Sequence, residues 1–176
     1  MDTLQAIRTR RSYRGKYLST LVPREHLLAI MEAGCDAPSG CNMQTASFIA
    51  IDDPVLLNRL KALVTPPVAE TAPAWILVLT RPIIAYRDRR FNVQDYAAAI
   101  ENMLLAIHAL GYASCWYEGH ITDDDDIAGQ LAGALNLPDD CRIVCLLPVG
   151  LPAGEANSPV KRPDAERIGF NQPPQA

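Results

Sequence analysis

One helical segment constrains the fold of this chain more than any other feature. Between Asp95 and Leu110 the apolar side chains recur at helical spacing, and Gly111 follows as a stop signal. This pattern predicts a helix of about four turns that is central to the fold. Three apolar runs are typical of buried strands: SFIAI at 47–51, WILVLT at 75–80 and RIVCLLPV at 142–149.

Shorter elements are expected between these. The patterns predict helices over 3–9, from Pro23 to about Gly34, over 55–63 and over 124–135, with a short strand over 114–117. Helices and strands do not alternate regularly, and no G-x-G-x-x-G motif follows a strand, which disfavours a Rossmann domain. The sequence therefore predicts an α+β fold with a mixed sheet.

The composition is that of an ordinary soluble globular protein. The chain has 176 residues, 49% of them apolar and 20% charged, which suits one domain with a sizeable core. Its net charge of −4 argues against a general nucleic-acid binder, because such proteins neutralise phosphates with Lys and Arg. No run is long enough to span a membrane, and the N-terminus lacks a secretory signal, so we expect a cytoplasmic protein that does not bind membranes.

The sequence changes character after Gly150. Residues 1–150 are expected to form a single α+β domain, whereas residues 151–176 are rich in Pro and polar side chains. This C-terminal extension has too few apolar residues to bury a core of its own. It therefore either dangles or lies on another surface, such as a second subunit.

An acidic run, TDDDD at 122–126, precedes the helix expected over 124–135. Calcium loops alternate their carboxylates and need a sharp turn at a Gly, and this run has neither feature. We instead expect Thr122 or Asp123 to cap the helix, with the following carboxylates at the positive end of its dipole.

The cysteines and histidines show no disulfide or metal-binding pattern. The five cysteines are odd in number and contain no C-x-x-C pair, which fits reduced thiols. Cys141 and Cys145 are expected to lie on one face of the last strand and to be buried there. The three histidines have no partner at a zinc-binding spacing, so no metal site is predicted.

Basic residues are concentrated near the N-terminus. The segment RTRRSYR at 8–14 holds four of the sixteen Lys and Arg residues. If it is extended, Arg10, Ser12 and Arg14 share one side, because side chains alternate along such a chain. Two guanidinium groups beside a hydroxyl suit a phosphate, but a solvated basic turn explains this segment equally well.

A second polar segment, CDAPSGCNMQTAS at 35–47, has more hydrogen-bonding side chains than a turn requires. Residues 38–40 suffice for the turn, yet the loop continues into Cys41, Asn42 and Gln44. Alone it could be a cap, a turn or a thiol site. A third segment, YEGH at 117–120, has a Gly that lets backbone approach a ligand closely, although its Glu is more often simply solvated.

Together these motifs resemble the FMN-dependent nitroreductase family. The match runs through RRSYR, APSGCNMQ, DYAAAIENMLLAIHALGYASCW, LPVGLP and KRP, in the family's order and over most of the chain. RRS-x-R and APSG-x-N-x-Q are specific at this separation when both occur. The resemblance implies a mainly antiparallel mixed sheet flanked by helices, in a homodimer that binds FMN at its interface and whose C-terminal tails embrace the partner subunits.

The resemblance also implies a role for individual residues in binding the cofactor. It implies no catalytic side chain, because the flavin carries the chemistry. The FMN phosphate would be held by Arg10 and Ser12, with Arg11 alongside, and Lys161 and Arg162 would complete this site. Arg14 would approach the N1/O2 edge of the ring. The other subunit would reach the flavin through Pro38, Ser39, Gly40, Asn42 and Gln44. The backbone of Tyr117, Glu118 and Gly119 would face the reactive N5.

The implied activity is a ping-pong reaction. NADH or NADPH would reduce FMN, and an electron-poor small molecule such as a nitroaromatic or a quinone would then take two electrons. Other functions stay open: a reductive dehalogenase-like or flavin-fragmenting relative on the same fold, or a non-catalytic flavin-binding or redox-sensing protein with Cys41 as its responsive thiol. An RNA-binding module that uses the basic segment is disfavoured by the acidic net charge.

The chain departs from the family pattern in two places. The family often continues Gln-Pro-Trp at the end of the loop, whereas this chain has Gln44-Thr45-Ala46. Between Thr80 and Asp95 there is little room for the helical excursion that covers the pocket in larger members. We therefore expect a more open substrate site.

Overall fold

The computed structural model describes residues 1–174 and contains a central antiparallel sheet. Its strands are β1 (Ala46–Ile51), β2 (Ala74–Thr80) and β5 (Arg142–Val149), in the order β1, β2, β5. Residues 113–117 run antiparallel beside β5, and Ser12 pairs in parallel with Ser114. The mixed, mainly antiparallel sheet is thus confirmed, although 114–117 makes isolated backbone pairs instead of the continuous strand that was predicted.

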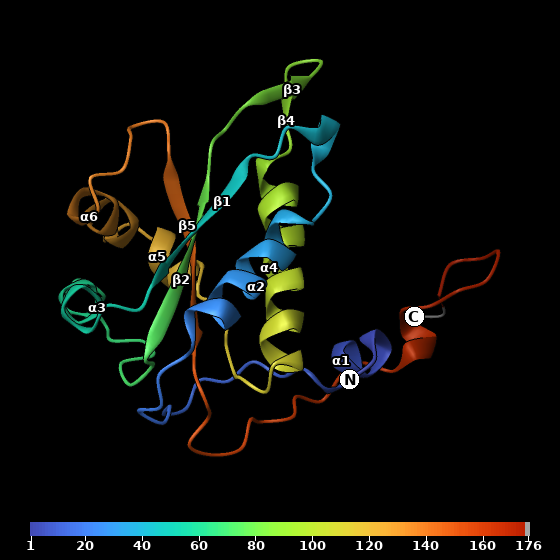
Figure 1. The fold of residues 1–176 in the computed structure, drawn as a ribbon. Coiled ribbons are helices and arrows are strands. Elements are labelled where there is room, and N and C mark those ends of the chain that lie inside the picture. Colours follow the sequence, from blue (N-terminus) through green and yellow to red (C-terminus); the bar gives the residue numbers. More distant parts are fainter. Residues whose placement is uncertain (175–176) are drawn as a thin grey trace.

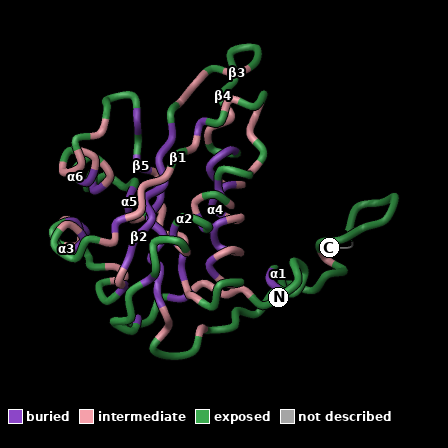
Figure 2. The backbone as a smooth tube through the Cα atoms, viewed as in Figure 1, coloured by how far each residue is buried: buried purple, intermediate pink, exposed green. Residues whose placement is uncertain are grey.

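Helices cover both faces of this sheet (Figure 1). On one face lie α3 (Pro54–Lys61), α5 (Gly119–Thr122) and α6 (Ile127–Ala134); on the other lie α2 (Arg24–Cys35) and α4 (Asn92–Ala109). Every residue of β2 is buried, because its side chains alternate between the two helical layers. Figure 2 shows the buried residues concentrated in β2, in β5 and along part of α4, whereas β1 is mostly of intermediate burial.

The helix expected at 95–110 is α4, and it is central as predicted. Its apolar stripe includes Ile100 and Met103, which are fully buried against the sheet and α2. Gly111, with a φ of 85°, ends the helix in the left-handed conformation that suits glycine. The helix begins three residues earlier than predicted, at Asn92.

The prediction that Cys141 and Cys145 share a face is wrong. A β-bulge leaves an extra residue in β5, because Val78 pairs with Cys145 and the next residue of β2 pairs with Ile143. The bulge reverses the alternation of side chains. Cys145 therefore packs toward α2 and α4, and Cys141 toward α3 and α6, although both are buried as expected.

The predicted cap of α6 is also wrong. Asp126 is the N-cap, and its carboxylate accepts a hydrogen bond from the Gly129 N–H at 3.2 Å. Thr122 instead ends the separate short helix α5, where its N–H donates to the Glu118 carbonyl at 3.0 Å. Because this turn already uses Thr122, α6 starts downstream, at Ile127.

A two-stranded hairpin fills the short segment before α4. Its strands are β3 (Ile84–Tyr86) and β4 (Arg89–Arg90), and both turn residues, Arg87 and Asp88, have positive φ values. This is the backbone pattern of a type I′ turn. The sequence lacks the Asn-Gly signal of such turns, so the hairpin was not predicted.

The remaining elements lie at the ends of the chain and in the 35–47 loop. They are α1 (Thr3–Thr9) and the single turns η1 (Gly40–Asn42) and η2 (Asp164–Glu166). After β5 the chain pairs with residues 16–18 and then leaves the body of the molecule (Figure 1). The last two residues of the predicted extension, 175–176, lie outside the described residues. None of the helices in the described part of the chain is long and apolar enough to cross a membrane.

Candidate functional site

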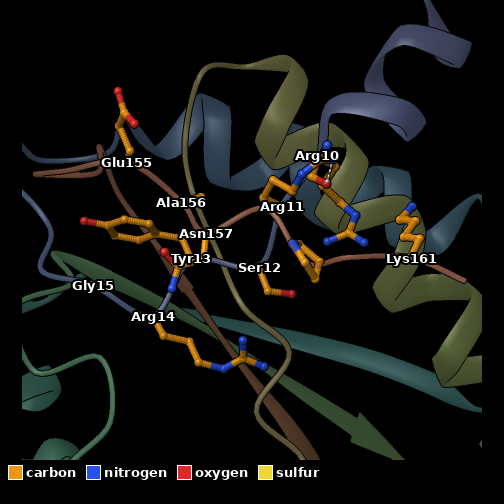
Figure 3. A pocket seen from close by; sticks show the side chains of 11 residues that line it. Arg10, Arg11, Ser12, Tyr13, Arg14, Gly15, Glu155, Ala156, Asn157 and Lys161 are labelled. Atoms are coloured by element: carbon orange, nitrogen blue, oxygen red, sulfur yellow. Dashed lines mark hydrogen bonds between the residues drawn. The ribbon is translucent and has the colours of Figure 1, made fainter.

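A basic cavity brings together five of the predicted site residues. The cavity has a volume of about 470 Å³ and lies between the N-terminal segment and the C-terminal extension (Figure 3). The predicted residues that line it are Arg10, Arg11, Ser12, Arg14 and Lys161. Thus Lys161 joins the N-terminal arginines although it is far from them in the sequence.

Backbone pairing explains how these segments meet. The Tyr13 N–H donates to the Ser114 carbonyl at 2.8 Å, which holds the basic segment against the chain that follows α4. The Ala153 N–H donates to the Lys16 carbonyl at 2.8 Å, so the extension is held next to the same segment. Residues 155–161 then pass along the cavity, where Glu155 and Lys161 lie at opposite ends (Figure 3).

The cavity is positively charged and contains an unsatisfied donor. Four cationic side chains and one carboxylate, that of Glu155, line it in a chain whose net charge is −4. The Arg10 Nε is buried without a hydrogen-bond partner in the described structure, and its nearest carboxylate oxygen, on Glu101, is 3.5 Å away. Burial, and after it the charges of Arg10 and Arg11, lower the pKa of nearby His108. An anion here would balance the excess positive charge of the lining residues.

The arginines are not equally available. Arg11 donates to two backbone carbonyls, those of Arg8 at 2.7 Å and Arg10 at 2.8 Å. Arg162 does not line the cavity; its guanidinium pairs with Glu166 at 3.1 Å. Asn157 lines the cavity but was not among the predicted residues, because a single polar residue in a Pro-rich tail carries no sequence signal.

The 35–47 loop lies elsewhere and is fastened to α4 by Asp95. This aspartate is buried in the first turn of the helix, and its two carboxylate oxygens accept hydrogen bonds from the Gly40 N–H and the Thr45 hydroxyl, both at 2.7 Å. The Gln44 N–H donates to the Ser39 hydroxyl at 3.0 Å. The loop therefore has a defined shape that is set by a residue fifty positions away.

That shape is costly for these residue types. Cys41, Asn42 and Gln44 all have φ values near 50°, a conformation that non-glycine residues adopt rarely. A Cβ on Gly40 would lie 2.5 Å from the Phe91 side chain, so only glycine fits there. Sequence reasoning missed Asp95, because an acid in the first turn of a helix is usually explained by the helix dipole.

The third predicted group lies beside β5. Tyr117 pairs with Leu146 through two backbone hydrogen bonds of 3.1 and 2.9 Å. The Glu118 carboxylate accepts from the Tyr96 hydroxyl at 2.8 Å and from the Trp116 indole at 2.7 Å. Burial, together with the Glu118 hydrogen bond, raises the pKa of Tyr96 to about 12. Both carboxylate oxygens of Glu118 therefore have hydrogen-bond donors. The space beside Gly119 is open: apart from its chain neighbours and the backbone of its own helix, no atom of the described residues lies within 4 Å of where a Cβ would stand.

One chain does not bring all the predicted residues into one cavity. The 35–47 loop is held by Asp95, at the start of α4. The basic cavity lies near His108, at the other end of α4, where the His108 ring nitrogen Nε2 is hydrogen-bonded to the Thr9 hydroxyl at 2.7 Å. The two positions on α4 are separated by roughly 20 Å along the helix axis. No residue of the 35–47 loop lines the basic cavity.

The five thiols should differ sharply in reactivity. Burial raises the pKa of Cys115, Cys141 and Cys145, whereas Cys35 and Cys41 are exposed. Because the thiolate is the reactive form, we expect iodoacetamide to modify two cysteines in the native protein and all five after denaturation. Peptide mass spectrometry measures this, and rapid native labelling of Cys145 would contradict the burial.

Similar proteins support one family. The model of the nitroreductase family matches residues 7–65 and 60–151. A Methanothermobacter thermautotrophicus protein, provisionally named NADH dehydrogenase/NAD(P)H nitroreductase, is 32% identical over 155 residues, which cover 87% of this chain and 78% of that protein.

Two solved structures have similar folds. One is a provisionally named nitroreductase from Desulfovibrio desulfuricans in complex with FMN, with 33% identity, a TM-score of 0.79 and coverage of 98% of each chain. The other is a Bacteroides fragilis nitroreductase with bound FMN, with 28% identity and a TM-score of 0.76. The match covers 98% of this chain and 100% of the Bacteroides fragilis chain. Since the family model spans most of the sequence and the fold agrees, this chain belongs to the nitroreductase family.

Proposed function

We propose that this protein is a homodimeric, FMN-dependent oxidoreductase that takes hydride from NADH or NADPH and reduces an electron-poor small molecule. The observation that carries the proposal is the basic cavity, where Arg10, Ser12, Arg14 and Lys161 meet. FMN bound in the two similar nitroreductases supports the choice of cofactor.

The residues of the cavity fit a phosphate. Guanidinium groups bind phosphate oxygens with paired hydrogen bonds, and both Arg10 and Arg14 line the cavity. Lys161, which lies near Arg10 in Figure 3, adds a point charge, and the Ser12 hydroxyl can add a further hydrogen bond. Arg162, held by Glu166, would have to break that exposed ion pair to take part.

The rest of the proposed site comes from a second copy of the chain. The 35–47 loop and the basic cavity lie apart in one subunit, so a partner would supply Pro38, Ser39, Gly40, Asn42 and Gln44. The extension supports such an interface, because the side chains of Val160, Ile168 and Phe170 are exposed on it. Large apolar side chains that are exposed on a segment without its own core are typical of a contact surface.

Within this site the protein would position charge and exclude water. When bound, FMN would supply two-electron hydride chemistry, in a ping-pong cycle with NAD(P)H and then an acceptor such as a nitroaromatic or quinone. Arg14 would place a cation at the N1/O2 edge, where it favours negative charge. The 117–119 backbone would face N5, and Glu118, already bonded to Tyr96 and Trp116, would keep that backbone in place.

The visible spectrum tests the proposal. We expect the purified protein to be yellow or to take up added FMN, and NADH or NADPH to bleach the flavin absorbance under anaerobic conditions. A colourless protein that does not bind FMN would contradict the proposal, and a yellow protein that neither nucleotide bleaches would be a passive flavin binder. Sedimentation is the companion measurement, since a monomer that retains FMN would exclude an interfacial site.

A further inference from the structure

The β3–β4 hairpin carries an unusual concentration of exposed positive charge. The segment RPIIAYRDRRF at 81–91 has four arginines and one acid. Arg81 is paired with Asp140 at 3.0 Å, but Arg87, Arg89 and Arg90 are exposed and form no ion pair within the described residues. The hairpin is therefore a local cationic surface on an acidic protein.

The turn itself does not explain its arginine. Arg87 and Asp88 have φ values of 46° and 60°, and type I′ turns strongly prefer Asn or Gly at these positions. Arg87 lies over the Tyr86 ring, with 5.0 Å between the guanidinium carbon and the ring centroid, and keeps its charge at the tip of the hairpin. A residue that is unfavourable for the turn and exposed at its tip suggests a binding role.

Both ends of the hairpin are fastened to the loop that is proposed to contact FMN. The Arg81 N–H donates to the Thr45 carbonyl at 3.1 Å, and the Phe91 side chain packs against Gly40. Between these ends, β3 lies against η1 (Figure 1). If the 35–47 loop forms a wall of the flavin site, the hairpin therefore lies at the edge of that site, because it is attached to the loop at both ends.

We propose that the hairpin arginines bind the 2′-phosphate of NADPH and so favour it over NADH as the reductant. This inference rests on the proposed function. Hydride transfer requires the nicotinamide to lie against the flavin, which leaves the adenosine end of the dinucleotide outside the ring site. Exposed guanidinium groups at the edge of the site suit a phosphate there, and the 2′-phosphate is the group that distinguishes the two nucleotides.

A variant with Arg87→Asn, Arg89→Gln and Arg90→Gln tests the hairpin. Asn suits the left-handed turn, so this variant removes charge without disfavouring the fold. In the FMN-loaded protein we expect the KM for NADPH to rise at least about tenfold, since one charge-assisted contact corresponds to roughly that factor. The KM for NADH should change less than about twofold. The amount of FMN bound per subunit should also change less than about twofold. Arg59→Gln, in α3 on the other side of the sheet, is the matched control.

Direct binding separates the possible sources of the anion. Calorimetry with 2′,5′-ADP and 5′-AMP should show weaker binding of 2′,5′-ADP to the triple variant and no change for 5′-AMP. An unchanged KM for NADPH in the triple variant would overturn the inference. The same holds if the KM for NADPH is unchanged and the KM for an anionic acceptor such as 4-nitrobenzoate rises, because the arginines would then bind the acceptor. A wild-type protein that binds FMN but prefers NADH would overturn it too, whereas failure to bind FMN would contradict the proposed function itself.

Discussion

Replacing both Arg10 and Arg14 with Ala is expected to weaken FMN binding by about 3–6 kcal/mol, because each charge-assisted contact contributes roughly 1.5–3 kcal/mol. Both side chains line the basic cavity, and the Nε of Arg10 is buried without a hydrogen-bond partner in the described chain. A loss of this size corresponds to roughly 10²- to 10⁴-fold in the dissociation constant. Fluorescence titration of the FMN-free protein measures it.

The control for this variant is Arg8→Ala. Arg8 belongs to the same basic segment but is exposed and does not line the cavity, so its loss should leave the dissociation constant of FMN nearly unchanged. The FMN-free double variant should remain folded, because the ion pair that it loses among residues 1–174, between Arg10 and Glu101, is partly exposed and contributes little. Unchanged FMN affinity in the double variant would refute the assignment of the cavity.

Asp95→Ala is expected to lower both the stability of the protein and its affinity for FMN. The substitution leaves the Gly40 N–H and the Thr45 hydroxyl without their shared acceptor, at a cost of roughly 2–4 kcal/mol in the free energy of unfolding. For a chain of this size the melting temperature should fall by about 5–15 °C. Because the loop would also lose its fixed shape, FMN affinity should fall by at least about tenfold.

Asp95→Asn distinguishes a positioning role from a general loss of stability. An Asn can accept from the Gly40 N–H through its oxygen and donate to the Thr45 hydroxyl through its nitrogen, so it should restore most of the FMN affinity. Adding Thr45→Val to Asp95→Asn should remove that rescue, whereas Thr45→Ser should preserve it. Equal FMN affinities in the Ala and Asn variants at position 95 would contradict the positioning role.

Local patterns predicted the elements that build the core. The apolar residues of α4 form one stripe that must be buried, and the apolar runs of β2 and β5 must be buried on both faces. Each of these elements formed within three residues of its predicted bounds. The predictions were wrong where the details of a strand or helix end depend on neighbouring parts of the chain. The bulge in β5 moved Cys145 to the opposite face, and the turn that ends at Thr122 displaced the cap of α6 to Asp126.

The sequence by itself determined the family and the kinds of residue available to a site: a basic segment, a polar loop rich in turn residues, and a tail without a core. These properties are carried by residue types and their order along the chain. The tertiary structure alone decided which of these residues meet. It brought Lys161 to Arg10, fastened the loop to Asp95, and set the basic hairpin against that loop, because contacts between distant segments depend on how the sheet and α4 pack.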